Sequence, residues 1–250
     1  KGQFYTPAEV SRIISQVIGL AGATDSKQSI YDPTCGSGSL LLKAHDEAKS
    51  ATGLDLAIYG QEMDNATSAL AKMNMILHDC PTAEIWKDNT LSAPHFKDRL
   101  GYLKLFDFIV ANPPFSTKAW SNGFNPAEDE YNRFSFGIPP EKNGDYAFLL
   151  HMLTSLKSTG KAAVILPHGV LFRGGAEATI RKRILQQGYI KGIKTVKNWT
   201  DGLTHEALTH DEMSQLKPSY EKDKQMWKET EEKEKKNFAT EKGNWLDDRQ

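Results

Sequence analysis

The sequence predicts an α/β protein whose doubly wound, mostly parallel sheet is covered by helices. The first observation is that short apolar runs typical of strands alternate with segments of helical period. The second is a glycine-rich loop, "DPTCGSGS", which follows the first such strand and precedes a helix. The third is that Asp32, Glu62 and Asp88 occur where three successive strands are expected to end. In doubly wound sheets, ligands bind at this edge.

The chain is expected to begin with a helix in "FYTPAEVSRIISQVIGLAG". Thr6 is the expected N-cap, Pro7 takes the first helical position, and Glu9 completes a capping box. Gly22 is expected to end this helix. Apolar residues at helical spacing form one stripe, made of Val10, Ile13, Ile14, Val17 and Ile18.

Strands and helices then alternate along the chain. Strands are expected at 29–32, 57–62, 83–87, 105–111, 161–167 and 188–193. Helices are expected at 39–49, in the Ala-, Leu- and Met-rich segment after Glu62, at 145–157 and at 175–187. Cationic residues in and before the last helix are expected to be solvated: Arg173, Arg181, Lys182 and Arg183.

Two stretches interrupt the alternation. The connection 116–144 is long, and its aromatic residues argue against disorder, so it is expected to be functional. After residue 193 the sequence becomes polar, with charges of both signs and few apolar anchors. We therefore expect a catalytic domain over 1–193 and an exposed helix or tail over 194–250.

The composition is that of a globular protein, with 39% hydrophobic and 25% charged residues. With a net charge of −1, the chain lacks the excess of basic residues that is typical of a stand-alone nucleic-acid-binding protein. If a nucleic acid is the substrate, other chains or segments are expected to supply much of the backbone contact. No apolar run approaches the ~20 residues of a membrane span. Cys35 and Cys80 show no metal-binding or CxxC spacing, which indicates reduced thiols and a cytoplasmic protein.

The glycine loop does not match the common nucleotide motifs. Gly36 and Gly38 fit the first two places of G-x-G-x-x-G, but Leu41 occupies the third, and no P-loop motif is present. Asp32, just before the loop, would repel a phosphate and suits a ligand that carries an amino group or a sulfonium. Glu62 is placed to accept hydrogen bonds from two ribose hydroxyls, and Asp88 from an exocyclic amine.

The run "ANPPF" ends the strand at 105–111 with a rigid turn, since each proline fixes its own φ and donates no backbone hydrogen bond. The turn presents Asn112, Phe115 and a carbonyl. Taken singly, the Gly-x-Gly pair could be a plain turn, Glu62 a solvated strand end and Asp88 a turn cap. Together, at successive strand ends, these residues predict a binding site for S-adenosylmethionine. The Asn-Pro-Pro-Phe turn that follows them predicts an amine as the group that is methylated.

The chain resembles the amino-methylating DNA methyltransferases, most closely the methylation subunit of type I restriction-modification systems, an N6-adenine DNA methyltransferase. The resemblance rests on "GQFYTP", "DPTCGSGSLLL", "GQEMD", "KDNTL", "ANPPF", "GDYAFLLHML" and "GKAAVILPHGVLFRGG". It runs from Gly2 to about Gly192, whereas the family has a helical domain before this region and further strands after it. It implies the Rossmann-like fold of S-adenosylmethionine-dependent methyltransferases.

The resemblance also implies roles for individual residues. The Asn112 amide and the Pro113 carbonyl accept hydrogen bonds from the adenine amino group, and Phe115 stacks on the flipped base. Asp32 and the glycine loop hold the methionine part of the cofactor, with Tyr5 and Thr6 near its carboxylate. Glu62 binds the ribose, and Met63, Asp88 and Asn89 contact the adenine. The implied catalytic set is Asn112, Pro113, Pro114 and Phe115. The implied cofactor set is Tyr5, Thr6, Asp32, Thr34, Gly36, Ser37, Gly38, Glu62, Met63, Asp88 and Asn89.

As partners, the resemblance implies double-stranded DNA and a DNA specificity subunit, with a second methylation subunit and a restriction subunit as further candidates. Two alternatives remain open from the residues. The same turn serves methyl transfer to adenine in RNA or to a glutamine amide in a protein. A chain of this kind could also be a non-catalytic scaffold that binds the cofactor, although a scaffold has no use for Asn112 and Phe115.

Overall fold

Five parallel strands form the sheet of the computed structural model, which describes residues 6–193. The strands are β1 (Ser29–Asp32), β2 (Ala57–Glu62), β3 (Glu84–Lys87), β4 (Phe106–Ala111) and β5 (Leu156–Val164). The helices are α1 (Ala8–Val17), α2 (Ser39–Thr52), α3 (Asn65–Leu77), α4 (Asp145–Thr154) and α5 (Ala176–Gln186). Tyr5 and the predicted polar segment 194–250 lie outside the described residues.

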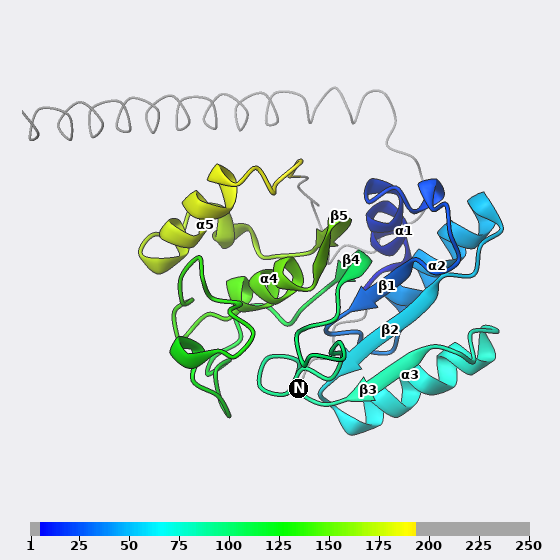
Figure 1. Cartoon of the computed structure of the whole chain (residues 1–250), viewed down its shortest axis with the longest axis horizontal. Helices are drawn as coiled ribbons and strands as arrows, with labels where there is room; N and C mark the ends of the chain where they lie inside the picture. The colour runs from blue at the N-terminus through cyan, green and yellow to red at the C-terminus, as the bar shows by residue number, and fades with distance from the viewer. Residues whose placement is uncertain (1–5, 194–250) are drawn as a thin grey trace, which may run out of the picture. The chain divides into compact units, whose positions relative to one another are not determined.

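The strand order is β3-β2-β1-β4-β5, and every neighbouring pair is parallel. The order therefore reverses between β1 and β4, which creates a topological switch point at the carboxyl ends of these two strands. Figure 1 shows α3 beside the edge strand β3, and α4 and α5 toward the β5 side. The prediction of a doubly wound parallel sheet is confirmed.

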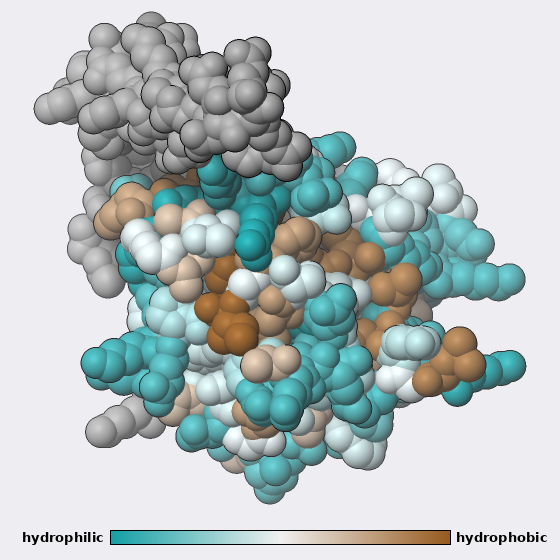
Figure 2. All heavy atoms as spheres, turned by 60° about the vertical axis from the view of Figure 1, so that its left-hand side comes forward, coloured by the Kyte–Doolittle hydropathy of each residue, from teal (hydrophilic) through white to brown (hydrophobic). Residues whose placement is uncertain are grey.

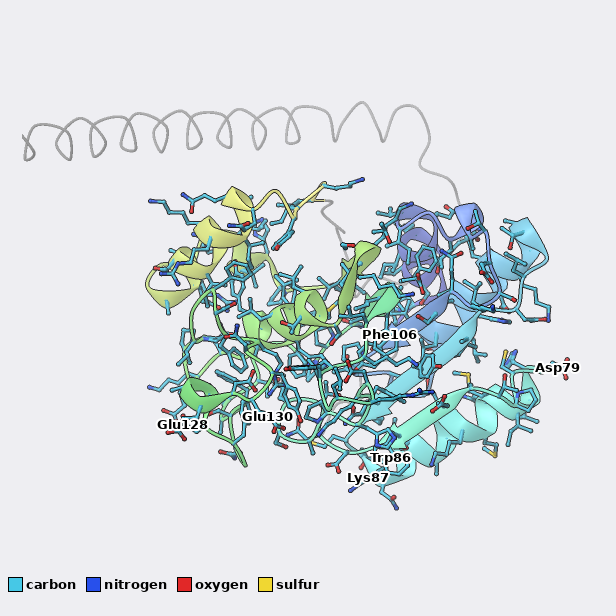
Figure 3. All side chains as sticks on the ribbon, in the orientation of Figure 1. Asp79, Trp86, Lys87, Phe106, Glu128 and Glu130 are labelled. Carbon is cyan, nitrogen blue, oxygen red and sulfur yellow. The ribbon has the colours of Figure 1, made fainter. Side chains whose placement is uncertain are left out.

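The buried side chains of the central strands explain why the sheet forms here. Ile30, Tyr31 and Ile109 are almost fully buried, as expected for strands covered on both faces. The rings of Tyr31 and Phe106 stack with their centroids 4.2 Å apart, and Figure 3 labels Phe106 on β4 among the packed side chains. In the view of Figure 2, hydrophobic residues form small patches among hydrophilic ones on the surface.

The first helix differs from the prediction at both ends. Pro7 is the N-cap of α1 and provides no side-chain cap, so the prediction of Thr6 as the cap is wrong. The helix ends at Val17, because Gly19 takes a left-handed φ of +71° and a short 3-10 turn, Leu20–Gly22, follows. The prediction of Gly22 as the stop is therefore also wrong. The Glu9 side chain lies outside the described part of the chain.

The apolar stripe of this helix is narrower than predicted. Three of its residues, Val10, Ile14 and Ile18, are buried, at spacings of four residues. Ile13 and Val17 are 45% and 54% exposed. Ser11 and Ser15, which are 1% and 0% exposed, complete the buried face of α1, so this face is apolar only in part.

The C-terminal elements show a second set of corrections. Residues 188–193 form no strand, and the chain leaves α5 through Gly188 with a φ of +70°. Strand β5 begins at Leu156 and not at the predicted 161. Pairing with β4 extends it across an irregularity between Phe106 and Phe108. Gly160 permits this close approach, because a Cβ there would lie 2.9 Å from the Phe106 carbonyl oxygen.

The long aromatic connection 116–144 is ordered and packs against α4 and α5. Trp120 and Phe134 are buried in one cluster with residues of both helices, and Trp120 donates a hydrogen bond to the Pro140 carbonyl at 2.9 Å. The buried Arg133 guanidinium pairs with Asp129 at 2.6 Å. The sequence-based argument against disorder in this connection is confirmed.

Candidate active site

The predicted site residues lie at one edge of the sheet. Asp32 and Glu62 are the last residues of β1 and β2, and Asp88 and Asn112 directly follow β3 and β4. Because these strands are parallel, their carboxyl ends meet at the same edge. Backbone hydrogen bonds tie the loops together, since Asp88 N–H donates to the Glu62 carbonyl at 3.0 Å and Cys35 N–H to the Gln61 carbonyl at 3.0 Å.

Asp32 is a buried carboxyl at the switch point, with 1% of its surface exposed. Its Oδ1 accepts a hydrogen bond from the backbone N–H of Thr34 at 2.8 Å, which closes a tight turn. Burial, reinforced by the charge of Glu62, raises the pKa of Asp32 to about 7, although the Thr34 amide opposes this shift. A cation placed against Asp32 would favour its ionised form.

The glycine loop and Glu62 are bound to each other. Gly36 N–H donates to Glu62 Oε2 at 3.0 Å, and Asp64 N–H donates to Oε1 of the same carboxylate at 2.8 Å. Gly36 and Gly38 have φ values of +55° and +80°, which side-chain-bearing residues rarely adopt. A Cβ on Gly38 would lie 2.6 Å from Met75 Cε on α3. These two glycines are thus favoured by the backbone conformation, and a side chain on Gly38 would in addition require Met75 to move.

The remaining predicted cofactor residues surround this loop. The Ser37 carbonyl accepts a hydrogen bond from Asn74 Nδ2 on α3 at 2.9 Å. Asp88 Oδ1 accepts from Asn89 N–H at 2.8 Å, and Asn89 Oδ1 accepts from Leu91 N–H at 2.9 Å. Met63 is 65% exposed, so its thioether is open to contact from a ligand.

The turn after β4 presents two different groups. Asn112 Nδ2 donates a hydrogen bond to Thr6 Oγ1 at 3.0 Å, and the Phe115 ring is 41% exposed. Ser116 has a φ of +50°, so the chain turns sharply directly after the ring. The Pro114 carbonyl accepts from Thr117 Oγ1 at 2.9 Å, which ties the turn to the connection behind it.

A buried ionic network that involves residues of α4 and α5 contacts this turn. It was not predicted from the sequence. Asp145, which is 1% exposed, accepts from Ser116 N–H at 2.7 Å and from Arg173 Nη2 at 2.6 Å. Arg173 Nε lies 2.8 Å from Glu177 Oε2 on α5. Arg181 donates to the carbonyls of Val170 and Arg173.

The expectation of solvated charges is therefore wrong for Arg173 and Arg181, and Arg183 donates to the Phe136 carbonyl at 3.0 Å. The sequence signal for this network was Asp145, an acidic residue in the first turn of α4.

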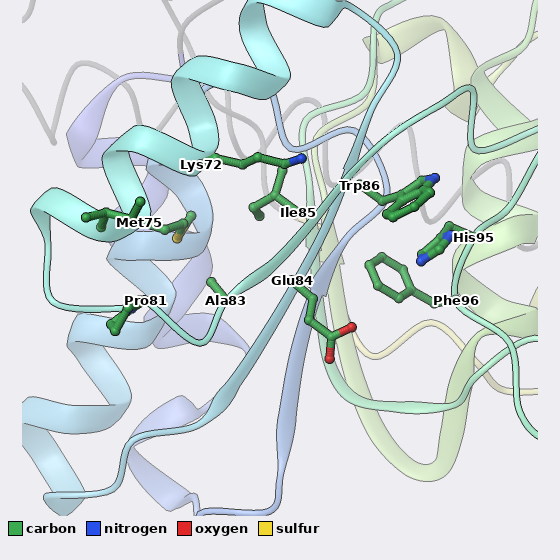
Figure 4. Close-up of a pocket in the computed structure, with 10 residues that line it drawn as sticks. Lys72, Met75, Pro81, Ala83, Glu84, Ile85, Trp86, His95 and Phe96 are labelled. Carbon is green, nitrogen blue, oxygen red and sulfur yellow. The ribbon is translucent and has the colours of Figure 1, made fainter.

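A separate groove lies at the β3 edge of the sheet, away from the predicted residues. Figure 4 shows Lys72 and Met75 of α3 on one side and the Trp86 and His95 rings on the other. The two rings stack with centroids 3.6 Å apart. None of the predicted site residues lines this groove.

Two further findings concern residues 6–193 only. No three His, Cys, Asp or Glu side chains among them gather into a group that could hold a metal ion. None of their helices combines the length and apolar character that crossing a membrane requires.

Comparison with known proteins gives a consistent result. A family model described as N-6 DNA methylase matches residues 1–198. The methylase subunit of the type I restriction enzyme MjaIX of Methanocaldococcus jannaschii is 32% identical over 198 residues, or 77% of this chain and 33% of that protein. The corresponding MpnII subunit of Mycoplasma pneumoniae is 33% identical over 201 residues, or 77% of this chain and 36% of that protein. The chain thus spans about a third of the length of these relatives.

Solved structures agree on the fold. The methyltransferase subunit of a type I restriction-modification system from Streptococcus thermophilus is 38% identical, with a TM-score of 0.67 over 75% of this chain and 39% of that chain. A class I S-adenosylmethionine-dependent methyltransferase from Listeria monocytogenes is 19% identical, with a TM-score of 0.54 over 72% of this chain and 51% of that chain, and bears on the fold alone. The predicted methyltransferase fold is confirmed.

Proposed function

The chain belongs to the N-6 DNA methylase family, and we propose that it is part of the methylation subunit of a type I restriction-modification system, which methylates N6 of adenine in DNA. The observation that carries the proposal is the turn after β4. Its Asn112 amide is held in place and its Phe115 ring is exposed, at the sheet edge that also carries Asp32 and Glu62.

The residues at this edge fit S-adenosylmethionine as the cofactor. Asp32, whose neutral form is favoured by burial, would be stabilised as a carboxylate by a ligand with a positive charge. At Gly36 no atom lies within 4 Å of the position that a Cβ would take, so the backbone of the loop is open on this side. We assign the methionine part to Asp32 and to the loop from Thr34 through Gly38, the ribose to Glu62, and the adenine to Met63, Asp88 and Asn89. The bound cofactor supplies an electrophilic methyl group on its sulfonium.

The turn after β4 prepares the target amine. The lone pair of an adenine amino group is delocalised into the ring, which makes it a poor nucleophile. Asn112 Oδ1 and the Pro113 carbonyl, both acceptors, would hold the two amine hydrogens out of the ring plane, so that the lone pair becomes available. Pro113 and Pro114 fix the backbone of the turn, so these acceptors need no reorganisation during the reaction.

Phe115 provides a stacking surface for a base that has left the duplex. Extruding a base from DNA costs a few kcal/mol of unstacking, and an aromatic contact offsets about 1–3 kcal/mol of this cost. The net charge of −1 provides little attraction for phosphates. A specificity subunit and the rest of a longer methylation subunit would therefore provide most of the contact with double-stranded DNA.

The experiment is a methyl-transfer assay with tritiated S-adenosylmethionine on DNA, RNA and protein separately, in the assembly with its specificity partner. We expect label in DNA, recovered after digestion as N6-methyladenine. Asn112→Ala should abolish transfer while the cofactor Kd stays unchanged, because the amide acts on the target. The matched control is Asn122→Ala, an exposed asparagine of the connection, which should remain active.

Label confined to RNA or to a protein glutamine would replace DNA with that substrate. Cofactor binding without transfer to any of the three would indicate the scaffold alternative. Full activity of Asn112→Ala would remove the amide from the mechanism.

A further inference from the structure

Thr6 lies beside Asn112 although 106 residues separate them in the sequence. Its hydroxyl oxygen accepts a hydrogen bond from Asn112 Nδ2 at 3.0 Å, and the residue is 7% exposed. Pro7 takes the N-cap position of α1, so capping does not explain the threonine. Burial alone does not explain it either, because valine has the same shape without the cost of burying a hydroxyl.

The hydrogen bond holds the Asn112 amide with its nitrogen toward Thr6 and its oxygen away from it. A carboxamide has a donor end and an acceptor end, and only the oxygen accepts a hydrogen bond from an amine. Since Nδ2 is turned toward Thr6, Oδ1 is left for the target. In a reversed amide, Nδ2 would point its hydrogens at the amine hydrogens of the target, which would lose one of their two acceptors, so the observed orientation is the productive one.

The position of Thr6 is itself set by the docking of α1. The side chains of Val10 and Ile14 are buried on one face of this helix. Ser11 N–H donates to the Pro7 carbonyl at 3.0 Å. The Ser11 hydroxyl also donates to this carbonyl, at 3.2 Å. The backbone next to Thr6 is therefore anchored by the first turn of a packed helix.

We propose that Thr6 is a positioning residue for methyl transfer, whose hydroxyl oxygen holds the Asn112 amide with Oδ1 toward the target amine. The inference rests on the proposed function, and it gives the N-terminal segment a role at the target amine. Thr6 would therefore act on the target and not only on the cofactor.

The test compares Thr6→Val with Thr6→Ser in single-turnover methylation by the full assembly at saturating cofactor. We expect Thr6→Val to slow transfer by about ten- to a hundredfold, the scale of one lost orienting hydrogen bond. Its cofactor Kd should change by less than about threefold. Thr6→Ser keeps the acceptor and should restore most of the rate. Ser15→Ala removes a buried hydroxyl from α1 without touching Asn112, and should match the unchanged chain.

A second measurement does not depend on methyl transfer. The side-chain amide protons of Asn112, assigned by their loss in Asn112→Ala, should exchange with water faster in Thr6→Val than in Thr6→Ser. If the chain methylates RNA or protein and not DNA, the same variants are compared on that substrate. The inference is overturned if Thr6→Val keeps the normal rate, or if its loss of rate disappears at saturating cofactor, or if amide exchange is the same in both variants.

Discussion

The two halves of the site are ordered by different kinds of contact. In the cofactor half, formed by the loops after β1, β2 and β3, carboxylate or amide oxygens accept from backbone N–H groups nearby, as in Asp32 with Thr34. In the target half, formed by the turn after β4, contacts span 106 residues to Thr6 and 29 residues from Ser116 to Asp145.

Contacts between neighbouring elements also hold the cofactor half, since Gly36 N–H donates to Glu62 and Asn74 Nδ2 donates to the Ser37 carbonyl. The target half differs because a buried ionic network and the side chain of Thr6 hold it. Breaking this network should mainly reduce stability, whereas substitutions of the ligand-facing residues of the cofactor half should mainly weaken binding.

The largest effect is expected at Arg173, whose guanidinium bridges two carboxylates. The side chains of Asp145 and Glu177 are 1% and 3% exposed, and both pair with this arginine. Arg173→Met would leave two buried acids without their shared partner, which should lower the free energy of unfolding by about 3–5 kcal/mol. Urea unfolding followed by circular dichroism measures this loss.

The matched control is Lys43→Met, which breaks an exposed pair with Asp46 and should cost at most about 0.5 kcal/mol. If the two variants lose equal stability, the ionic network does not support the target half, and the contrast with the cofactor half fails.

The same contrast explains which parts of the site the sequence could predict. Asp32, Gly36 and Glu62 belong to short patterns at strand ends, and their positions followed from the alternation of strands and helices. Arg173 carries no such pattern, because its partners are brought close only by the packing of α4 and α5, and its expected role as a solvated charge was wrong. Thr6 was placed in the cofactor set by the "GQFYTP" motif, but its expected role as a helix cap was wrong, and its contact with Asn112 depends on the packing of α1.

The errors in the fold have a related cause. Residues 156–160 have weak strand propensity, and β5 includes them because β4 provides a hydrogen-bonding edge. The segment 188–193 has apolar residues but no strand partner within the described residues. Tertiary context decided both cases, whereas the well-patterned strands β1, β2 and β4 were predicted to within a residue.

An intermediate effect is expected at Glu62, in the cofactor half. Glu62→Ala should weaken S-adenosylmethionine binding by about 1–3 kcal/mol, the scale for losing hydrogen bonds to a charged acceptor. Titration calorimetry measures the Kd, and thermal unfolding measures the separate loss of stability from the two hydrogen bonds that Gly36 and Asp64 donate to Glu62. Glu84→Ala, at the exposed start of β3, is the matched control and should bind normally. An unchanged Kd for Glu62→Ala would remove Glu62 from the cofactor site.

The smallest effect is a dependence of cofactor affinity on pH, through Asp32. Burial raises the pKa of this carboxyl from an ordinary 3.8 to about 7, so the folded chain holds a proton that the unfolded chain releases. The unliganded fold should thus lose stability as pH rises from about 4 to 7, because the folded state binds more protons over this range. Cofactor binding has the opposite sign, since a positive ligand favours the ionised form and binds with release of a proton.

Between pH 6 and 8 the ionised fraction of a group with a pKa of about 7 rises about tenfold, and the affinity for S-adenosylmethionine should rise by about the same factor. Calorimetry in buffers of different ionisation enthalpy should detect the released proton below pH 7. Asp32→Asn keeps the acceptor for the Thr34 amide and removes the titration, so its affinity should be weaker and nearly independent of pH. If Asp32→Asn retains the full pH dependence, another group titrates, for instance the amino group of the cofactor itself. Asp32 would then be a turn residue whose charge the ligand does not use.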